Sequence, residues 1–163
     1  MVRPYRYDDY DTLLEVTGLA FDGVSIDQNI EKLYGVINHV DWRERKVSHT
    51  QADVADNPTG VLVADEDGVA VGFVSCRFNP RTLIGWIPNL AVHPDHQGKG
   101  IGKQLMAAAL DYFRALGMKF VRIETLEQNE RCCALYPKLG FREVARQVHY
   151  VMPLDDDASD RRP

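Results

Sequence analysis

The sequence predicts an α/β fold, and three observations carry that prediction. Residues 61–76 contain two β-rich runs around an Asp-Gly turn, a pattern typical of a hairpin. Residues 86–92 predict a strand that leads through a glycine-rich loop into a helix, whose apolar side chains recur at helical spacing as far as Leu116. Residues 120–124 predict the next strand. This order of strand, helix and strand implies a right-handed crossover and parallel pairing.

The segments before the hairpin predict a first strand and further helices. Residues 2–7 predict a short strand, and Asp8 or Asp9 is placed to cap a helix over residues 10–21. Residues 42–55 are rich in charge and predict either another helix or a mobile segment. Between these two stretches, apolar residues are spaced like one face of a helix, namely Ile26, Ile30, Leu33, Ile37 and Val40.

The segments after the central helix predict one more helix and two more strands. Gly117 is placed to end the central helix. Residues 129–138 predict a short helix that Gly140 closes. Residues 141–145 and 148–154 predict the last two strands.

Composition favours a globular protein of the cytoplasm. The chain has 163 residues, of which 45% are hydrophobic, and its formal net charge of -5 disfavours nucleic acid as a partner. Its odd number of cysteines forms no disulfide framework, and it shows no signal peptide and no apolar run long enough to span a bilayer. We therefore expect a single domain over residues 1–154, a disordered polar tail over residues 155–163, and no membrane partner.

The glycine-rich loop predicts a binding site for phosphate. Gly98, Gly100 and Gly102 let the backbone approach a ligand closely, and the first turn of the following helix leaves N–H groups unpaired at the positive end of the helix dipole. Lys99 and Lys103 add positive charge to the same turn. A simple tight connection between strand and helix is the alternative, but it needs fewer glycines.

Two common phosphate-binding patterns do not match this loop. The P-loop pattern requires glycine where Gln97 stands and serine or threonine where Gln104 stands. The dinucleotide fingerprint requires its third glycine at the position of Lys103. The remaining pattern is Gln97-x-x-Gly100-x-Gly102, preceded by Leu-x-Val-x-Pro.

This pattern resembles the acetyl-CoA-binding motif of the GCN5-related N-acetyltransferase (GNAT) family. A second stretch resembles the second signature of that family, with Asn129, Tyr136, Gly140 and Phe141 in register. It departs from the signature at Cys132, where a small alanine is common, and at Pro137. The two motifs together cover roughly residues 61–154.

The resemblance implies both the fold and the ligand site. The implied fold is a mixed, mostly antiparallel sheet of six or seven strands with helices on both faces, which splays open beside the glycine-loop strand. The backbone of Leu90, Ala91 and Val92 would pair with the pantetheine arm of acetyl-CoA. Asn129 would contact the same arm, and Tyr136 would point at the thioester sulfur. The pyrophosphate would bind the amides of Gln97, Gly98, Lys99, Gly100, Ile101, Gly102 and Lys103.

The implied chemistry is direct attack of a primary amine on acetyl-CoA in a ternary complex. Backbone amides near residues 90–92 would stabilise the oxyanion, and the Tyr136 phenol would return a proton to the leaving thiolate. Many relatives carry a basic carboxylate where this chain has Pro88. Glu124 is the candidate that remains for this base. Alternatively, Tyr136 only packs against the core, and Glu124 faces solvent or forms an ion pair.

The acceptor and the oligomeric state stay open at this point. The acceptor is either a small-molecule amine or a protein or peptide amine, and a homodimer through an edge strand near the C-terminus is one arrangement. Acidic residues of the segment over 22–57 would favour a cationic amine, namely Asp22, Asp27, Glu31, Asp41 and Glu44. Because of Pro88, a non-catalytic acyl-CoA sensor is the alternative function.

Other polar clusters suggest structural roles. His93 and His96 flank a Pro-Asp turn without a set of further ligands, so no metal site is expected. Cys132 and Cys133 have no basic partner in the pattern, so packing is expected rather than a thiol nucleophile.

Overall fold

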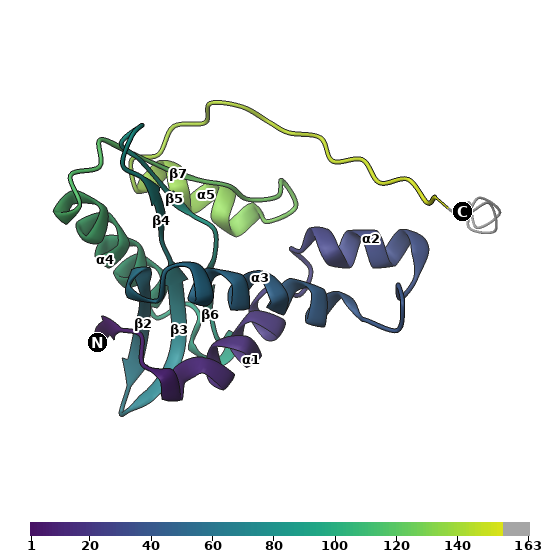
Figure 1. Cartoon of the computed structure of the whole chain (residues 1–163), viewed down its shortest axis with the longest axis horizontal. Helices are drawn as coiled ribbons and strands as arrows, with labels where there is room; N and C mark the ends of the chain where they lie inside the picture. Colours follow the sequence, from purple (N-terminus) through teal and green to yellow (C-terminus); the bar gives the residue numbers. More distant parts are fainter. Residues whose placement is uncertain (155–163) are drawn as a thin grey trace.

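We describe the protein from a computed structural model, in which residues 1–154 are described. The tail over residues 155–163, which we expect to be disordered, lies outside the described residues. The described part contains seven strands in two sheets, with five α-helices (Figure 1). The strands are β1 (Val2–Pro4), β2 (Val61–Glu66), β3 (Val69–Ser75), β4 (Arg77–Asn79), β5 (Ile84–Ile87), β6 (Leu90–Val92) and β7 (Phe120–Ile123). The helices are α1 (Tyr10–Ala20), α2 (Ile26–Tyr34), α3 (Trp42–Asp56), α4 (Ile101–Ala115) and α5 (Glu130–Lys138).

The larger sheet has the order β1-β2-β3-β6, and all its pairs are antiparallel. Helix α4 covers one face of this sheet, while α1 and α3 lie on the other (Figure 1). Leu105 and Phe113 of α4 are fully buried in the core on the first face, and Leu13 and Val16 of α1 are buried on the second. The prediction of an α/β fold with helices on both faces is therefore confirmed.

The strand expected over residues 86–92 is two strands in two different sheets. β5 pairs with β4 and, in parallel, with β7, whereas β6 pairs with β3. Pro88 lies between them and has no N–H to continue a ladder, so the pairing is interrupted there. The β5–β7 pairing ends at Ile87 and Ile123, and beyond this point β6 and β7 diverge. The parallel pairing is as predicted, and the break makes the opening in the sheet.

The expected hairpin is present, and its turn has the predicted chemistry. β2 and β3 are antiparallel neighbours, and Asp67 and Gly68 both have positive φ angles, of 53° and 87°. Two consecutive residues with positive φ angles form a type I′ turn, and the backbone twist of this turn matches the twist of the paired strands.

The N-terminal helices differ from prediction at their ends. α1 spans nearly the expected residues, but the carboxylate of Asp9 does not cap it. Instead, Asp9 accepts hydrogen bonds from the Arg6 amide at 2.7 Å and from the Arg3 guanidinium at 2.7 and 2.8 Å. The Arg3 side chain holds the pKa of Asp9 below its usual range. Asp9 therefore ties β1 to the turn that precedes α1.

Helix α2 is shorter than the apolar spacing predicts. The predicted helix face runs from Ile26 to Val40. α2 ends at Tyr34, because Gly35 takes a φ angle of +76°, and Ile37 and Val40 form an isolated bridge outside the helix. The charged segment that follows is the helix α3, and the Asp41 side chain caps it by accepting from the Glu44 amide at 2.9 Å.

The C-terminal segment corrects the prediction of two last strands. Residues 141–145 and 148–154 are irregular, and the chain runs away from β7 toward α2 (Figure 1). Nothing in the described part of the chain pairs with this segment as a strand. Residues 1–154 contain no helix that is both long and apolar enough to cross a membrane.

Candidate functional site

The glycine loop has the backbone conformation that its glycines permit. A short 3₁₀ turn (Pro94–His96) follows β6, and α4 begins at Ile101 with Gly100 as its N-cap residue. Gly98 and Gly100 have φ angles of +82° and +84°, which side chains other than glycine rarely adopt. Gly102 lies inside the first turn of the helix, where a Cβ would come within 3.8 Å of the Leu90 side chain.

The amides of this loop are free to bind an anion. The amides of Lys103 and Gln104 bond to the Gly100 carbonyl, at 3.0 and 3.1 Å. Within the described residues, the amides from Gly98 to Gly102 have no hydrogen-bond partner. The side chains of Lys99 and Lys103 are exposed beside them. The arrangement combines unpaired N–H groups, a helix dipole and positive side chains, which suits a pyrophosphate.

The edge of β6 that faces the sheet opening is also unpaired within residues 1–154. On its other edge, Leu90, Ala91 and Val92 pair with β3. Such an edge can accept hydrogen bonds from, and donate them to, the amide groups of an extended ligand. The structure therefore brings the predicted residues of the pantetheine and pyrophosphate sites into one continuous stretch.

Side chains of Gln97 and Arg131 connect the loop to α5. The Gln97 amide nitrogen donates to the Val92 carbonyl at 3.0 Å, and Arg131 donates to the Gln97 side-chain oxygen. The sequence pattern did not single out Arg131, because a lone arginine in the first turn of a helix carries no signal. Its guanidinium adds a third cation near the glycine loop.

Asn129 and Tyr136 lie at the two ends of α5. The Asn129 side chain caps the helix by accepting from the Cys132 amide at 3.2 Å. Tyr136 packs against Phe141, with 5.9 Å between ring centroids, and against the core next to α4. Burial, assisted by the Cys132 thiol, raises the pKa of Tyr136 well above its usual value. The phenol therefore keeps its proton at neutral pH.

Glu124 is exposed and already paired. It follows β7 directly, and its carboxylate accepts from Arg122 at 2.7 Å. More than half of each side chain is exposed to solvent. The structure thus places Glu124 at the surface end of β7 in a salt bridge.

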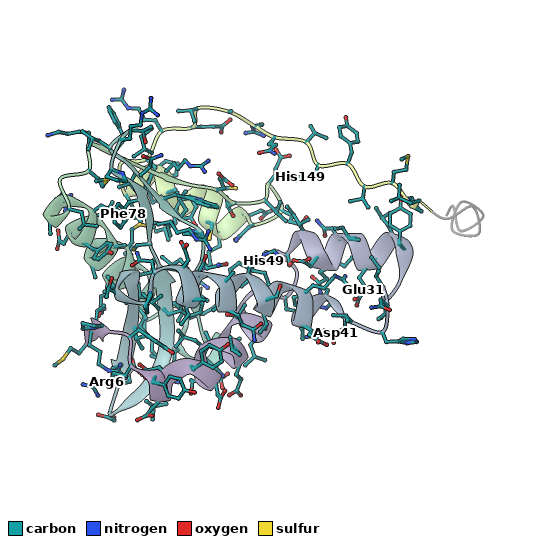
Figure 2. All side chains as sticks on the ribbon, in the orientation of Figure 1. Arg6, Glu31, Asp41, His49, Phe78 and His149 are labelled. Atoms are coloured by element: carbon teal, nitrogen blue, oxygen red, sulfur yellow. The ribbon has the colours of Figure 1, made fainter. Side chains whose placement is uncertain are left out.

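The acidic residues expected to attract a cationic acceptor are mostly engaged with arginines. Asp22 pairs with Arg43 at 3.5 Å, and Arg45 lies 3.8 Å from Asp27 and 3.4 Å from Glu31. Figure 2 shows Glu31 and Asp41 together at the α2–α3 end of the molecule, remote from Phe78 of β4. Asp41 and Glu44 belong to the N-cap of α3.

A buried polar network at Asn89 is the feature that the sequence interpretation missed. Asn89 lies at the break between β5 and β6, and its side chain accepts from Lys46 Nζ and donates to Asp53, both at 2.6 Å. Asp53 also accepts from the Ser75 hydroxyl at 2.5 Å and from Arg77 at 2.9 Å. A signal was present, since α3 buries polar residues at helical spacing on one face, namely Lys46, Thr50 and Asp53.

The remaining histidines and cysteines have other surroundings. Residues 1–154 contain no group of three histidine, cysteine or acidic side chains able to hold a metal ion. His96 instead lies 2.7 Å from Glu66. Cys76 is buried, which raises the pKa of its thiol to about 12, whereas Cys133 is exposed.

Comparison with known proteins gives concordant matches. The model of the acetyltransferase (GNAT) family matches residues 28–141. An uncharacterized N-acetyltransferase of Archaeoglobus fulgidus is 32% identical over 146 residues, which cover 86% of this chain and 92% of that protein. A mycothiol acetyltransferase of Propionibacterium freudenreichii is 33% identical over 152 residues, which cover 90% of this chain and 44% of that protein.

Solved structures share the fold. The PaiA N-acetyltransferase of Thermoplasma acidophilum, determined in complex with coenzyme A, superposes with a TM-score of 0.70 at 22% identity, covering 87% of this chain and 89% of that chain. The present chain spans less than half the length of the mycothiol acetyltransferases that it matches. The family match over residues 28–141, together with the split sheet and the glycine loop, shows that the chain belongs to the GNAT family of acetyltransferases.

Proposed function

We propose that the protein is an acetyl-CoA-dependent N-acetyltransferase that acetylates a primary amine. Two sets of free backbone groups on one stretch of chain carry the proposal: the open edge of β6 and the amides from Gly98 to Gly102 at the start of α4. An extended ligand that ends in a pyrophosphate would use the strand edge for its amide groups and the loop amides for its phosphates. Family membership and the coenzyme A complex of the PaiA protein support the same ligand.

The residues present fit acetyl-CoA at both ends of the site. The amides from Gly98 to Gly102, with the side chains of Lys99 and Lys103, would hold the pyrophosphate, whereas the Gln97 and Lys103 amides already donate to the carbonyls of Pro94 and Gly100. The edge of β6 and the Asn129 side chain would hold the pantetheine arm. When bound, acetyl-CoA supplies an activated acetyl thioester.

The chain itself contributes orientation and proton transfer. Of the backbone amides at residues 90–92, those on the open edge of β6 would stabilise an oxyanion, and the pairing of the other edge with β3 would hold them in position. The Tyr136 phenol, kept protonated by burial, is our proposed proton donor to the leaving thiolate. These roles require no metal ion.

The acceptor is an amine of either class, small molecule or protein. The relatives named mycothiol acetyltransferases favour a small-molecule amine. The acidic side chains around α2 do not argue for a polycation, since Arg43 and Arg45 lie against three of them.

An acyl-CoA sensor without catalysis is the second candidate. It is favoured by Pro88, which stands where many relatives have a basic carboxylate. A sensor needs the loop and the β6 edge but no acceptor.

Release of free CoA thiol from acetyl-CoA, measured over a panel of small amines and N-terminal and lysine peptides, tests this proposal. A transferase releases thiol only when an acceptor is present, and an equal amount of acetylated amine forms. Tight acetyl-CoA binding without acceptor-dependent release favours the sensor. Absence of acetyl-CoA binding contradicts both.

We also propose that two copies of the chain associate through β7. This strand is the edge of its sheet within the described residues, and its Phe120 is exposed. The C-terminal segment exposes further apolar side chains, namely Val144, Val148, Tyr150, Val151, Met152 and Leu154.

A further inference from the structure

Lys46 is a buried cation, and no carboxylate of the described residues forms a salt bridge with it. Its ammonium donates to Asn89 Oδ1 at 2.6 Å and lies 3.9 Å from the centre of the Phe21 ring. An ammonium has three N–H groups. In the described residues, one of them donates to Asn89, and the Phe21 ring covers another side of the ammonium. The residue is only 9% exposed, so bulk water has little access to the N–H groups that the described residues leave without a partner.

The charges around Lys46 are few and mostly engaged elsewhere. From α2, Asp27 acts on it at a distance and lies 3.8 Å from Arg45. From its own helix α3, Asp53 acts on it but is hydrogen-bonded to Asn89, Ser75 and Arg77. α1 presents Phe21, and the break before β6 presents the neutral Asn89.

Burial therefore dominates the titration of this group. Removal of the ammonium from water lowers the pKa of Lys46 from 10.5 to about 8, although Asp27 and Asp53 partly oppose the shift. A lysine with such a pKa holds an appreciable fraction of neutral amine at slightly alkaline pH. The same side chain at the surface would not.

The location of Lys46 matches a chemical need of the proposed function. Asn89 directly precedes Leu90, the first residue of the proposed thioester site, and no titratable group occupies Pro88 or Asn89. The α1–α2 loop on the same side carries the Ser25 hydroxyl, which is buried and has no partner in the described structure. Two unfilled polar positions thus occur around the end of α1, which is where a polar acceptor would be held.

We propose that Lys46 is the proton acceptor that converts the incoming ammonium of the acceptor into a nucleophilic amine, a role that rests on the proposed transferase function. One N–H bond of the acceptor breaks, the proton binds the lone pair of Lys46 Nζ, and it then passes to bulk water. Asn89 positions Nζ by accepting a hydrogen bond from one of its N–H groups. Asp53 and Ser75 in turn fix Asn89, whose backbone amide donates to the Ser75 hydroxyl at 3.1 Å.

Substitution by arginine separates the basic role from the structural one. Lys46→Arg keeps a cation beside Asn89 and Phe21 but cannot be deprotonated near neutral pH. We expect it to retain the melting temperature and acetyl-CoA affinity of the wild type, to lose about 10²-fold in kcat, and to lose the inflection near pH 8 in the kcat profile. Lys32→Arg, at an exposed lysine of α2, is the matched control and should leave the profile unchanged.

Two further arms keep the test decisive. Glu124→Gln addresses the rival base; a loss of the inflection in this variant, with a normal profile for Lys46→Arg, overturns the proposal. In wild-type protein with isotope-labelled lysine, the Lys46 signals should titrate near pH 8 by NMR, and titration near the ordinary value of about 10.4 overturns it. If no acceptor is ever acetylated, the transferase proposal fails, whereas the NMR titration still reports on Lys46.

Discussion

At the scale of single residues, burial sets the chemistry of the two side chains on which the proposed reaction depends. It raises the pKa of the Tyr136 phenol and lowers the pKa of the Lys46 ammonium. Both shifts favour the neutral form of the group, because an apolar surrounding disfavours charge. Burial thus keeps the phenol protonated and leaves a share of the lysine unprotonated at slightly alkaline pH, which are the forms that the proposed donor and acceptor require. Glu124, which is exposed and paired with Arg122, experiences no comparable burial.

Tyr136→Phe tests the proposed donor. The substitution removes only the hydroxyl and keeps the ring that packs against Phe141. We expect kcat to fall about 10²-fold, with little change in acetyl-CoA affinity, since the hydroxyl acts on the leaving group and not on binding. Tyr7→Phe, at an exposed tyrosine, serves as the control. An unchanged kcat in Tyr136→Phe removes the assignment.

At the scale of elements, Gly100 and Gly102 of the glycine loop are explained by different physical requirements. Gly100 needs its positive φ to begin α4, whereas Gly102 is helical and has room for a Cβ near Leu90. A Cβ at Gly102 would lie 3.8 Å from the Leu90 side chain and 4.0 Å from the Val92 side chain, both of β6. Folding therefore requires Gly100, and the proposed ligand is the reason we give for Gly102.

A pair of alanine substitutions distinguishes these uses. Gly100→Ala should lower both stability, by about 1 kcal/mol, and acetyl-CoA affinity, because the left-handed conformation is strained for alanine. Gly102→Ala should leave the melting temperature unchanged or higher, because alanine favours helix, but weaken acetyl-CoA binding. Calorimetry and titration with acetyl-CoA measure both quantities. If Gly102→Ala binds acetyl-CoA as the wild type does, the glycine is only a feature of the turn.

The elements themselves were largely predictable, and the exceptions have physical causes. The hairpin, α1, α4 and α5 follow from local periodicity and turn residues. The strand over residues 86–92 was predicted as one because its apolar pattern is continuous, and a single Pro88 without an N–H divides it. Local patterns also could not show that Lys46 and Asn89 meet, since 43 residues separate them in sequence.

At the scale of the whole molecule, the C-terminal part shows what pattern alone does not decide. The sequence of residues 141–145 and 148–154 predicts strands, but a strand requires a paired neighbour, and here the segment extends beyond the sheet (Figure 1). The same fact leaves β7 with an open edge. An open edge and exposed apolar residues together favour association of copies.

Light scattering coupled to size-exclusion chromatography tests this association. We expect a dimer whose population rises with protein concentration. Phe120→Lys places a charge on the β7 edge and should shift the equilibrium toward monomer. The control, Val69→Lys, changes an exposed apolar residue of β3 outside this edge and should leave the dimer intact. A wild type that stays monomeric over the measured range contradicts the proposal.

A titration of isotope-labelled protein with acetyl-CoA, followed by backbone amide NMR, locates the binding site. We expect the largest shifts at residues 97–103, with further shifts at residues 90–92 and Asn129. Shifts elsewhere with the first turn of α4 undisturbed, or no shifts at all, would contradict the claim that this loop and the β6 edge form the acetyl-CoA site.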